Sequence, residues 1–312
     1  MKIVATTGNA DLARVYIAEL SDGRHIEFVE SKIPGIPREK KWVLIISSSV
    51  GCPVGCSMCD AGLVKYEGKL TKDEIFAQID FLVKKYCPDM KIPADKFKIQ
   101  FARVGEPSFN EAVLDVLDEL PSRYDAPGLT PAISSIAPLH HDSFFERLFL
   151  IKEKNYKGKF QLQFSIHSTS ESERKKIIPI PLWSFEKIAE FGKGFHKPGD
   201  KKITLNFAAI KGTEFDPSVL YKHFSPDKFL VKITPLNPTN RSSYEGISNS
   251  LNVNTPESFA PIYKLRDLGY DVIVSIGELE ENNIGSNCGQ YILSHLNTNK
   301  IESAYTYPIT VP

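Results

Sequence analysis

The chain has 312 residues, 42% of them hydrophobic, and it carries 38 basic and 38 acidic side chains, so its formal net charge is zero. This is the composition of a globular protein with a sizeable core, and it argues against a general nucleic-acid binder, a class that carries a basic excess. No apolar stretch of the sequence is long enough for a membrane-spanning helix, and the N-terminus lacks a signal-peptide core. Three of the five cysteines lie close together, which favours a reducing compartment over a disulfide framework, and we expect a cytoplasmic protein.

The predicted elements begin with a β-hairpin over residues 13–31, whose turn is Asp22-Gly23. From residue 42 onward, strand-like and helix-like segments alternate, which is typical of βα units around a parallel sheet. Strands are expected over 42–48, 97–103, 132–137, 160–168, 203–210, 229–237 and 271–278, and helices over 71–86, 110–124, 142–154, 184–195 and 257–270. Six strands before residue 240 are too few for a closed eight-stranded barrel, so the pattern predicts an α/β fold with a partial barrel or an open doubly wound sheet.

Three cysteines, Cys52, Cys56 and Cys59, lie in one loop with the spacing C-x3-C-x2-C. Thiolates are the usual protein ligands of iron–sulfur clusters, and three of them can hold three irons of a [4Fe–4S] cube while the fourth iron stays open to a small molecule. The alternative is a structural zinc site, but such sites need four ligands and no further Cys or His is near in sequence. The spacing therefore favours the cluster.

Polar residues stand where the predicted strands end, which is where parallel α/β folds collect their ligand sites. Glu106, in Gly105-Glu106-Pro107, could accept a charge-assisted hydrogen bond from an ammonium group, although a simple turn is the alternative. Serines and asparagines at strand ends are most often turn formers, but together these side chains predict a polar collar at one rim. Its other members are Ser134, Ser135, Ser165, His167 and Asn237.

The cysteine spacing resembles that of the radical S-adenosylmethionine (SAM) enzymes. The resemblance implies that a [4Fe–4S] cluster binds SAM through its open iron and that reductive cleavage yields a 5′-deoxyadenosyl radical. It also implies an electron donor such as a flavodoxin or ferredoxin. The family usually has an aromatic residue just before the third cysteine, and this chain has Met58, whose polarizable side chain can also pack on a ring.

The motifs SSSVGCPVGCSMCDAG, VGEPSFN, SSIAP, QFSIHS, ITPLNP and SNCGQYI together resemble the dual-cysteine radical SAM methyltransferases of ribosomal RNA, typified by RlmN and Cfr. This resemblance runs from about Leu20 to Tyr291 and implies a partial (βα)6 barrel with Gly105, Glu106, Ser134 or Ser135, Ser165, His167 and Asn237 in the SAM pocket. It places Glu27 at a carboxylate involved in proton transfer and Cys288 at the cysteine that carries the methyl group. A radical on that methyl would then add to an unreactive aromatic carbon, in RNA adenine or in a changed substrate.

The chain departs from this family at Ile45, seven residues before Cys52, where those enzymes keep a second catalytic cysteine that releases the product. Isoleucine cannot act as a nucleophile, so the usual release step is unavailable. The chain also begins close to the hairpin, and we expect it to lack the N-terminal RNA-binding domain of the rRNA enzymes. The expected divisions are a hairpin extension at 1–40, a barrel at 41–285 and a tail carrying Cys288 at 286–312.

Three hypotheses follow. The first two are a methyltransferase acting on RNA with an altered release step, and a divergent radical SAM enzyme with another substrate or non-methylating chemistry. The third is a non-enzymatic cluster or zinc protein. Ile45 and the neutral charge favour a family member with a changed substrate.

Overall fold

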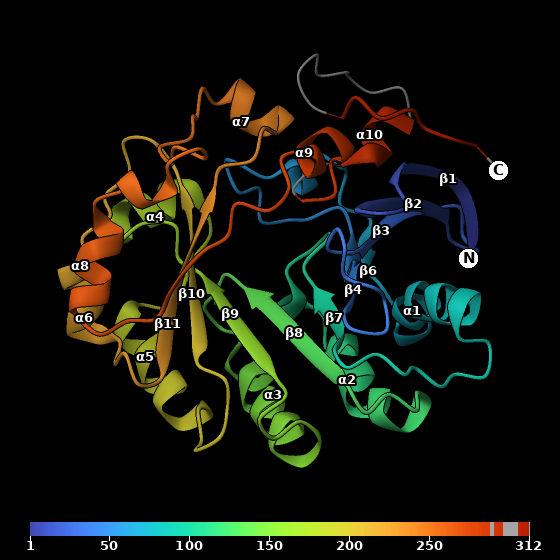
Figure 1. The fold of residues 1–312 in the computed structure, drawn as a ribbon, viewed down its shortest axis with the longest axis horizontal. Coiled ribbons are helices and arrows are strands. Elements are labelled where there is room, and N and C mark those ends of the chain that lie inside the picture. The colour runs from blue at the N-terminus through green and yellow to red at the C-terminus, as the bar shows by residue number, and fades with distance from the viewer. Residues whose placement is uncertain (288–289, 296–304, 312) are drawn as a thin grey trace.

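The computed structural model describes residues 1–287, 290–295 and 305–311, and within them ten strands form one sheet. The strands lie in the order β1-β2-β3-β4-β7-β8-β9-β10-β11-β12, and the sheet is strongly curved (Figure 1). Because the two edge strands, β1 and β12, do not pair with each other, this is an open, partial barrel.

The barrel strands from β4 to β12 are parallel, as the βα alternation predicted. They are β4 (Trp42–Ile46), β7 (Phe97–Phe101), β8 (Leu129–Ser135), β9 (Gln161–Ser165), β10 (Ile203–Ala209), β11 (Phe229–Pro235) and β12 (Val272–Val274). In β4, β7, β9 and β11 fully buried residues alternate with partly buried ones, because successive side chains of a strand point to opposite faces. The fully buried set, such as Leu44, Ile99 and Val231, joins the main hydrophobic core.

Helices cover the outer side of the curved sheet (Figure 1). They are α1 (Lys72–Tyr86), α2 (Ala112–Arg123), α3 (Asp142–Asn155), α4 (Glu171–Ile177), α5 (Phe185–Phe195), α6 (Pro217–His223) and α8 (Pro261–Asp267). The predicted helix at 71–86 begins at a capping box in which Thr71 and Glu74 bond each other's backbone. The short helices α4 and α6 had no sequence prediction.

The N-terminal strands extend the sheet. The predicted hairpin is β2 (Ala13–Glu19) with β3 (His25–Ser31), and an unpredicted strand, β1 (Lys2–Asn9), pairs with β2. One face of this ribbon joins the main core, and the other packs against α9 (Glu280–Ile284) and α10 (Tyr291–His295). Since β3 also pairs with β4, the sheet is continuous across residue 40. The domain boundaries expected at residues 40 and 285 stay predictions.

None of the helices in the described ranges has the length and apolar character that crossing a bilayer requires. The remaining short elements are β5 (Ser49–Val50), β6 (Gly68–Lys69), α7 (Asn240–Tyr244) and the 3-10 turns Asp60–Gly62, Pro107–Phe109 and Pro256–Ser258. Several of them shape the site described next.

Candidate functional site

The three clustered cysteines lie on the loop after β4, between the paired strands β5 and β6. The backbone N–H of Cys52 donates to the carbonyl of Ala61 (3.0 Å), and that of Cys59 donates to the carbonyl of Cys56 (3.1 Å). These bonds fold the loop back on itself. All three cysteines are partly buried.

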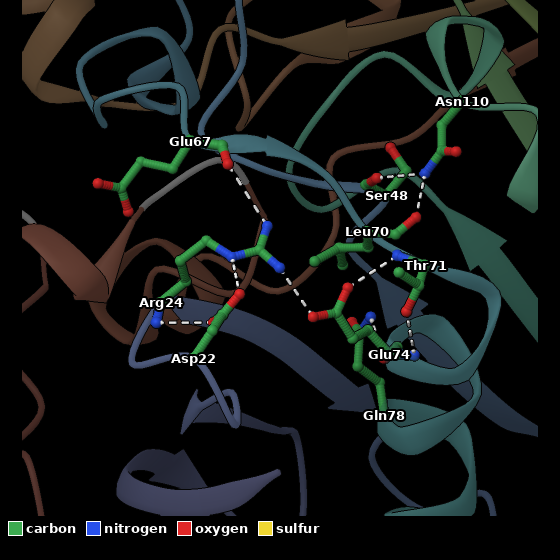
Figure 2. A network of polar contacts seen from close by, with 9 residues as sticks. All are labelled: Asp22, Arg24, Ser48, Glu67, Leu70, Thr71, Glu74, Gln78 and Asn110. Atoms are coloured by element: carbon green, nitrogen blue, oxygen red, sulfur yellow. Dashed lines mark hydrogen bonds and ion pairs between the residues drawn. The ribbon is translucent and has the colours of Figure 1, made fainter.

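The two ends of this cysteine loop are fixed by one buried amide. Asn110 Nδ2 donates to the carbonyl oxygens of Ser48 and Leu70, at 2.8 Å each (Figure 2). Gln78 of α1 adds a second clamp, because its amide exchanges two hydrogen bonds with the backbone of Ser47 (2.9 and 3.1 Å). The loop therefore begins and ends at fixed points, which holds its thiols in register with the neighbouring strands.

The turn of the hairpin is tied to the same region. Arg24 pairs with Asp22 (2.6 Å) and with Glu74 at the start of α1 (2.8 Å), and it approaches the Glu67 carbonyl near the end of the loop (Figure 2). This network links the N-terminal extension to the loop that carries the cysteines.

Asp60, directly after Cys59, is fully buried, and it links the cysteine loop to two segments that are distant in sequence. Its carboxylate accepts hydrogen bonds from the backbone N–H groups of Asn240 (3.1 Å) and Arg241 (2.8 Å) at the start of α7, and from the Tyr305 hydroxyl (3.0 Å). Thr239 also donates to the carbonyl of Met58 (3.0 Å). Asp60 was not predicted from the sequence, and its position beside Cys59, a predicted cluster ligand, was the one available signal.

The cysteine loop and the strand ends enclose a cavity of about 240 Å³, called the site cavity below. Its wall contains all three cysteines and Met58 from the loop. It also contains every residue predicted for the SAM pocket, namely Gly105, Glu106, Ser134, Ser135, Ser165, His167 and Asn237. The structure thus brings together side chains that are spread over 186 positions of the chain, from Cys52 to Asn237. Their individual roles stay predictions.

Glu106 is buried at the end of β7 and its carboxylate is held from several sides. It accepts from the Ser108 N–H (3.1 Å), the Ser108 hydroxyl (2.7 Å) and the Ile136 N–H (3.0 Å). Burial raises the pKa of Glu106, while hydrogen bonds from Ser135 and Ser108 act in the opposite direction. A fixed carboxylate in this setting is suited to accept from a cationic ligand group.

His167 has a defined tautomer. The Ala208 N–H donates to its Nδ1 (3.0 Å), so the ring carries its proton on Nε2, and burial lowers the pKa of this imidazole to about 3. The neutral ring on the cavity wall is therefore a hydrogen-bond donor at ordinary pH. Asn206, which was not predicted from the sequence, also lines the cavity, and its buried Oδ1 has no partner among the described residues.

The cavity suits an iron–sulfur cluster in the chemistry of its donors. Burial raises the pKa of Cys52 to about 11, and the pKa of Cys56 is raised by burial and by the nearby Cys59 and Cys52. Three thiolates at this place need a compensating cation, which bound iron supplies. In the described ranges no three His, Cys, Asp or Glu side chains are placed around a single ion, but a cube takes each thiolate on a different iron.

Glu27 does not line the site cavity. It is fully buried and forms an ion pair with Arg103, whose Nη2 lies 2.5 Å from Glu27 Oε1. Arg103 also donates to the carbonyls of Gly285 (2.9 Å) and Ser286 (3.0 Å), and the Ile292 N–H donates to Glu27 Oε2 (3.1 Å). Burial raises the pKa of Glu27 against the opposing effect of Arg103. The pair thus clamps the segment on both sides of position 288.

Cys288 itself lies outside the described residues. Its neighbour Asn287 lines both the site cavity and a second cavity inside the barrel. Ile45 lines that second cavity too and packs against the cluster formed by α9, α10 and the N-terminal strands. Ile45, predicted to stand where the resembled enzymes have their second cysteine, therefore shares a cavity wall with Asn287.

Comparison with known proteins shows similarity to RlmN enzymes over most of the chain. The dual-specificity RNA methyltransferase RlmN of Marinomonas sp. (strain MWYL1) is 26% identical over 305 residues, which is 93% of this chain and 76% of that protein. The RlmN of Vesicomyosocius okutanii is 26% identical over 310 residues, 96% of this chain and 80% of that protein. No family model matches the chain.

Solved structures share the fold. A radical SAM methyltransferase from Sphaerobacter thermophilus superposes with a TM-score of 0.70 at 19% identity, covering 93% of this chain and 80% of that one. SuiB of Streptococcus suis, bound to S-adenosylmethionine, gives 0.51 at 13% identity, covering 76% and 50%. These comparisons confirm the predicted resemblance to RlmN and the predicted radical SAM fold.

Proposed function

We propose that this protein is an RlmN-like radical SAM methyltransferase that binds a [4Fe–4S] cluster through Cys52, Cys56 and Cys59. One observation carries the proposal: the three thiols and the seven predicted SAM-pocket residues line a single cavity at the carboxyl ends of parallel strands. The similarity to enzymes named RlmN over more than nine-tenths of the chain supports it.

The chain's own groups suit binding and orientation of SAM. When bound, the reduced cluster supplies the electron that cleaves SAM. In this proposal Glu106 accepts from the ligand's ammonium group and the Nε2–H of His167 donates to a ligand acceptor, and both residues line the site cavity. The unpartnered Oδ1 of Asn206 is a further acceptor in the same wall.

The methyl carrier in this proposal is Cys288, and the acceptor is an unreactive carbon of RNA adenine or of a changed substrate. The clamp formed by Arg103 and Glu27 supports this, because it fixes the backbone at 285–286 and 292, on both sides of the cysteine. Glu27 is then a residue that positions the segment, and a direct part in proton transfer is a further element of the proposal. Product release must use a group other than residue 45.

The electron donor, the partner and the compartment complete the proposal. A flavodoxin or ferredoxin would reduce the cluster in the cytoplasm, a compartment that keeps thiols reduced. RNA is the substrate class suggested by the names of the relatives.

The ligand assignment is tested by replacing each of Cys52, Cys56 and Cys59 with Ala, and Cys87, which lies outside the site cavity, serves as the matched control. We expect the three variants to lose iron, sulfide and SAM cleavage after anaerobic reconstitution, while Cys87→Ala keeps all three. Iron-loaded, SAM-cleaving variants at 52, 56 or 59 would overturn the assignment.

The methyl-carrier role is tested separately by intact-protein mass spectrometry after incubation with SAM. We expect one added methyl group on the wild type and none on Cys288→Ala, whose cluster and SAM cleavage stay intact. An unmethylated wild type that still cleaves SAM would favour the second candidate, a radical SAM enzyme with non-methylating chemistry on a non-RNA substrate. The specific observation behind that candidate is Ile45 at the family's nucleophile position.

A further inference from the structure

The inside of the partial barrel holds a second cavity, called the lumen cavity below, with a volume of about 410 Å³. Its wall includes Ile45 of β4, Lys98 and Gln100 of β7, and Gln161 of β9. Charged side chains are frequent in this wall, and cations outnumber anions: they are Lys32, Lys41, Lys96 and Lys98 against Glu278 and Glu281. A parallel barrel interior is normally filled with branched apolar side chains, so this lining requires an explanation.

The lumen cavity and the site cavity share a wall residue, and the same face of β7 contributes to both. Lys98, Gln100 and Ala102 are spaced two residues apart, so they point to one side of β7 and its extension. The first two line the lumen cavity and the third lines the site cavity. From Lys98 to Ala102 the strand advances about 13 Å. Asn287 belongs to both walls.

No counter-charge pairs with the Lys98 side chain. In the described part of the chain its ammonium group makes no hydrogen bond or ion pair, and the charged groups that act on it most are the cations Lys232, Lys96, Lys41 and Lys201. Burial, reinforced by these lysines, lowers the pKa of Lys98 to about 7. A cation withdrawn from solvent among other cations is costly, and proteins keep such groups where an anion compensates them.

We propose that the lumen cavity binds the anionic end of the substrate, a phosphate or carboxylate held by Lys98 with Lys96 and Lys41, while the reacting carbon lies in the site cavity. This inference rests on the proposed function and adds a substrate class to it: a small organic anion. The cavity volume is that of a small-molecule site.

A folded RNA fits this space poorly. An RNA-modifying enzyme contacts phosphates on a surface that the nucleic acid can reach, whereas Lys98 lines a cavity at the opposite end of β7 from the site cavity, about one strand length away. The neutral net charge agrees, because RNA binding depends on many phosphate contacts. A small anion needs only the few lysines that the lumen provides.

The test is calorimetric titration of the anaerobically reconstituted full chain with pyrophosphate and, separately, with citrate. The variants are Lys98→Gln and Lys98→Arg, and Lys154→Gln is the matched control because Lys154 is an exposed lysine on the outer helix α3. We expect saturable one-site binding of at least one probe, weakened roughly tenfold or more by Lys98→Gln and unchanged by Lys154→Gln. Pyrophosphate preference would indicate a phosphate end, and citrate preference a carboxylate end.

Proton uptake gives a second readout. At pH 8 wild-type Lys98 is largely neutral, and an anion that pairs with it must bring in a proton, so the binding heat should vary with the ionisation heat of the buffer. Lys98→Arg should keep binding but lose this dependence, because arginine is always protonated. No binding by the wild type, or equal binding by Lys98→Gln, would overturn the proposal.

An adenine-containing RNA oligonucleotide that displaces the probe would overturn the small-molecule assignment. Since none of these titrations needs turnover, their failure leaves the cluster assignment untouched. Conversely, a protein that cleaves no SAM can still bind pyrophosphate or citrate as expected here, so the two proposals fail independently.

Discussion

At the scale of single residues, the site depends on Gly105, which stands between β7 and Glu106. Its φ of +99° is in the region that favours glycine, and a Cβ there would lie 2.1 Å from the Ser49 hydroxyl oxygen and 2.7 Å from that of Ser48. The end of β7 can therefore approach the cysteine loop only because this position has no side chain.

Replacing Gly105 with Ala should lower the free energy of unfolding by about 2–4 kcal/mol and reduce the iron content, because the loop must move away from the strand. Urea unfolding and iron analysis measure both effects. Gly194→Ala is the matched control: Gly194 is inside α5, and a Cβ added there would have no atom within 4 Å, so this change should stabilise the helix by about 0.5–1 kcal/mol. If Gly105→Ala and Gly194→Ala had the same effect on the free energy of unfolding and on the iron content, the close approach at Gly105 would not matter for the site.

The lowered pKa of Lys98 predicts that the stability of the fold depends on pH. Its pKa is about 7 in the folded protein and 10.5 in the unfolded chain, so between these values the unfolded state binds more protons. The free energy of unfolding should therefore rise with pH through this window. Lys98→Gln should flatten the rise between pH 7 and pH 8.5, a range below the titration of most thiols. Denaturant unfolding at several pH values checks this, and parallel curves for variant and wild type would show that Lys98 is not titrating there.

At the scale of elements, the cysteine loop is held by its ends rather than by secondary structure of its own. The carbonyls of Ser48 and Leu70 share one donor group, the Asn110 amide, so the two ends of a long loop depend on a residue that follows the next strand. Figure 2 shows this amide reaching from Asn110 to both ends. Such a clamp reduces the entropy that the loop must lose when it binds a metal cluster.

Asn110→Ala should lower the free energy of unfolding by about 2–3 kcal/mol, because two buried carbonyls lose their donor. It should also speed the loss of iron to a chelator. Asn254→Ala, on an exposed loop, provides the comparison and should change neither quantity. Chelator kinetics that are identical for wild type and Asn110→Ala would mean that the clamp does not control the loop.

The elements also show what could be predicted from sequence. Strands β7 and β9 alternate apolar and polar residues, β4 and β11 are mainly apolar, and α1 follows its capping box, so these elements were predicted close to their observed bounds. Strand β1 was missed because Lys2–Asn9 offers only Ile3, Val4 and Ala5 as an apolar signal, and its pairing with β2 is what makes it a strand. Helices α4, α6 and α7 are five to seven residues long, too short for a clear helical period.

At the scale of the whole molecule, a buried ion pair connects the barrel to the segment before Cys288. Glu27 comes from the N-terminal extension, Arg103 from the end of β7, and the carbonyls of Gly285 and Ser286 from the C-terminal part. Three regions far apart in sequence are thus fixed around one guanidinium group.

Arg103→Leu should lower the free energy of unfolding by about 3–5 kcal/mol, because Glu27 stays buried without its partner. The double variant Arg103→Leu/Glu27→Leu should recover part of this loss, but not all of it, since the two carbonyls still lack a donor. Urea unfolding of the single and double variants completes the cycle. Backbone hydrogen exchange at residues 285–287 should be faster in the Arg103→Leu variant and in the double variant. If the free-energy losses of the two single variants simply add in the double variant, Arg103 and Glu27 are not coupled.

Local patterns along the chain were enough to predict which residues share the site cavity. The three clustered cysteines, Gly105-Glu106 and the polar residues at strand ends were singled out from neighbouring positions, and all of them line one cavity. Asp60, Asn206, the Arg103–Glu27 clamp and the lysine-lined lumen became visible only in the folded molecule. Asp60 bonds residues about 180 and 245 positions away, and Lys98 lies near lysines from three other segments. Such contacts arise when distant strands are brought side by side in the sheet, and no local pattern records which distant side chains will face each other there.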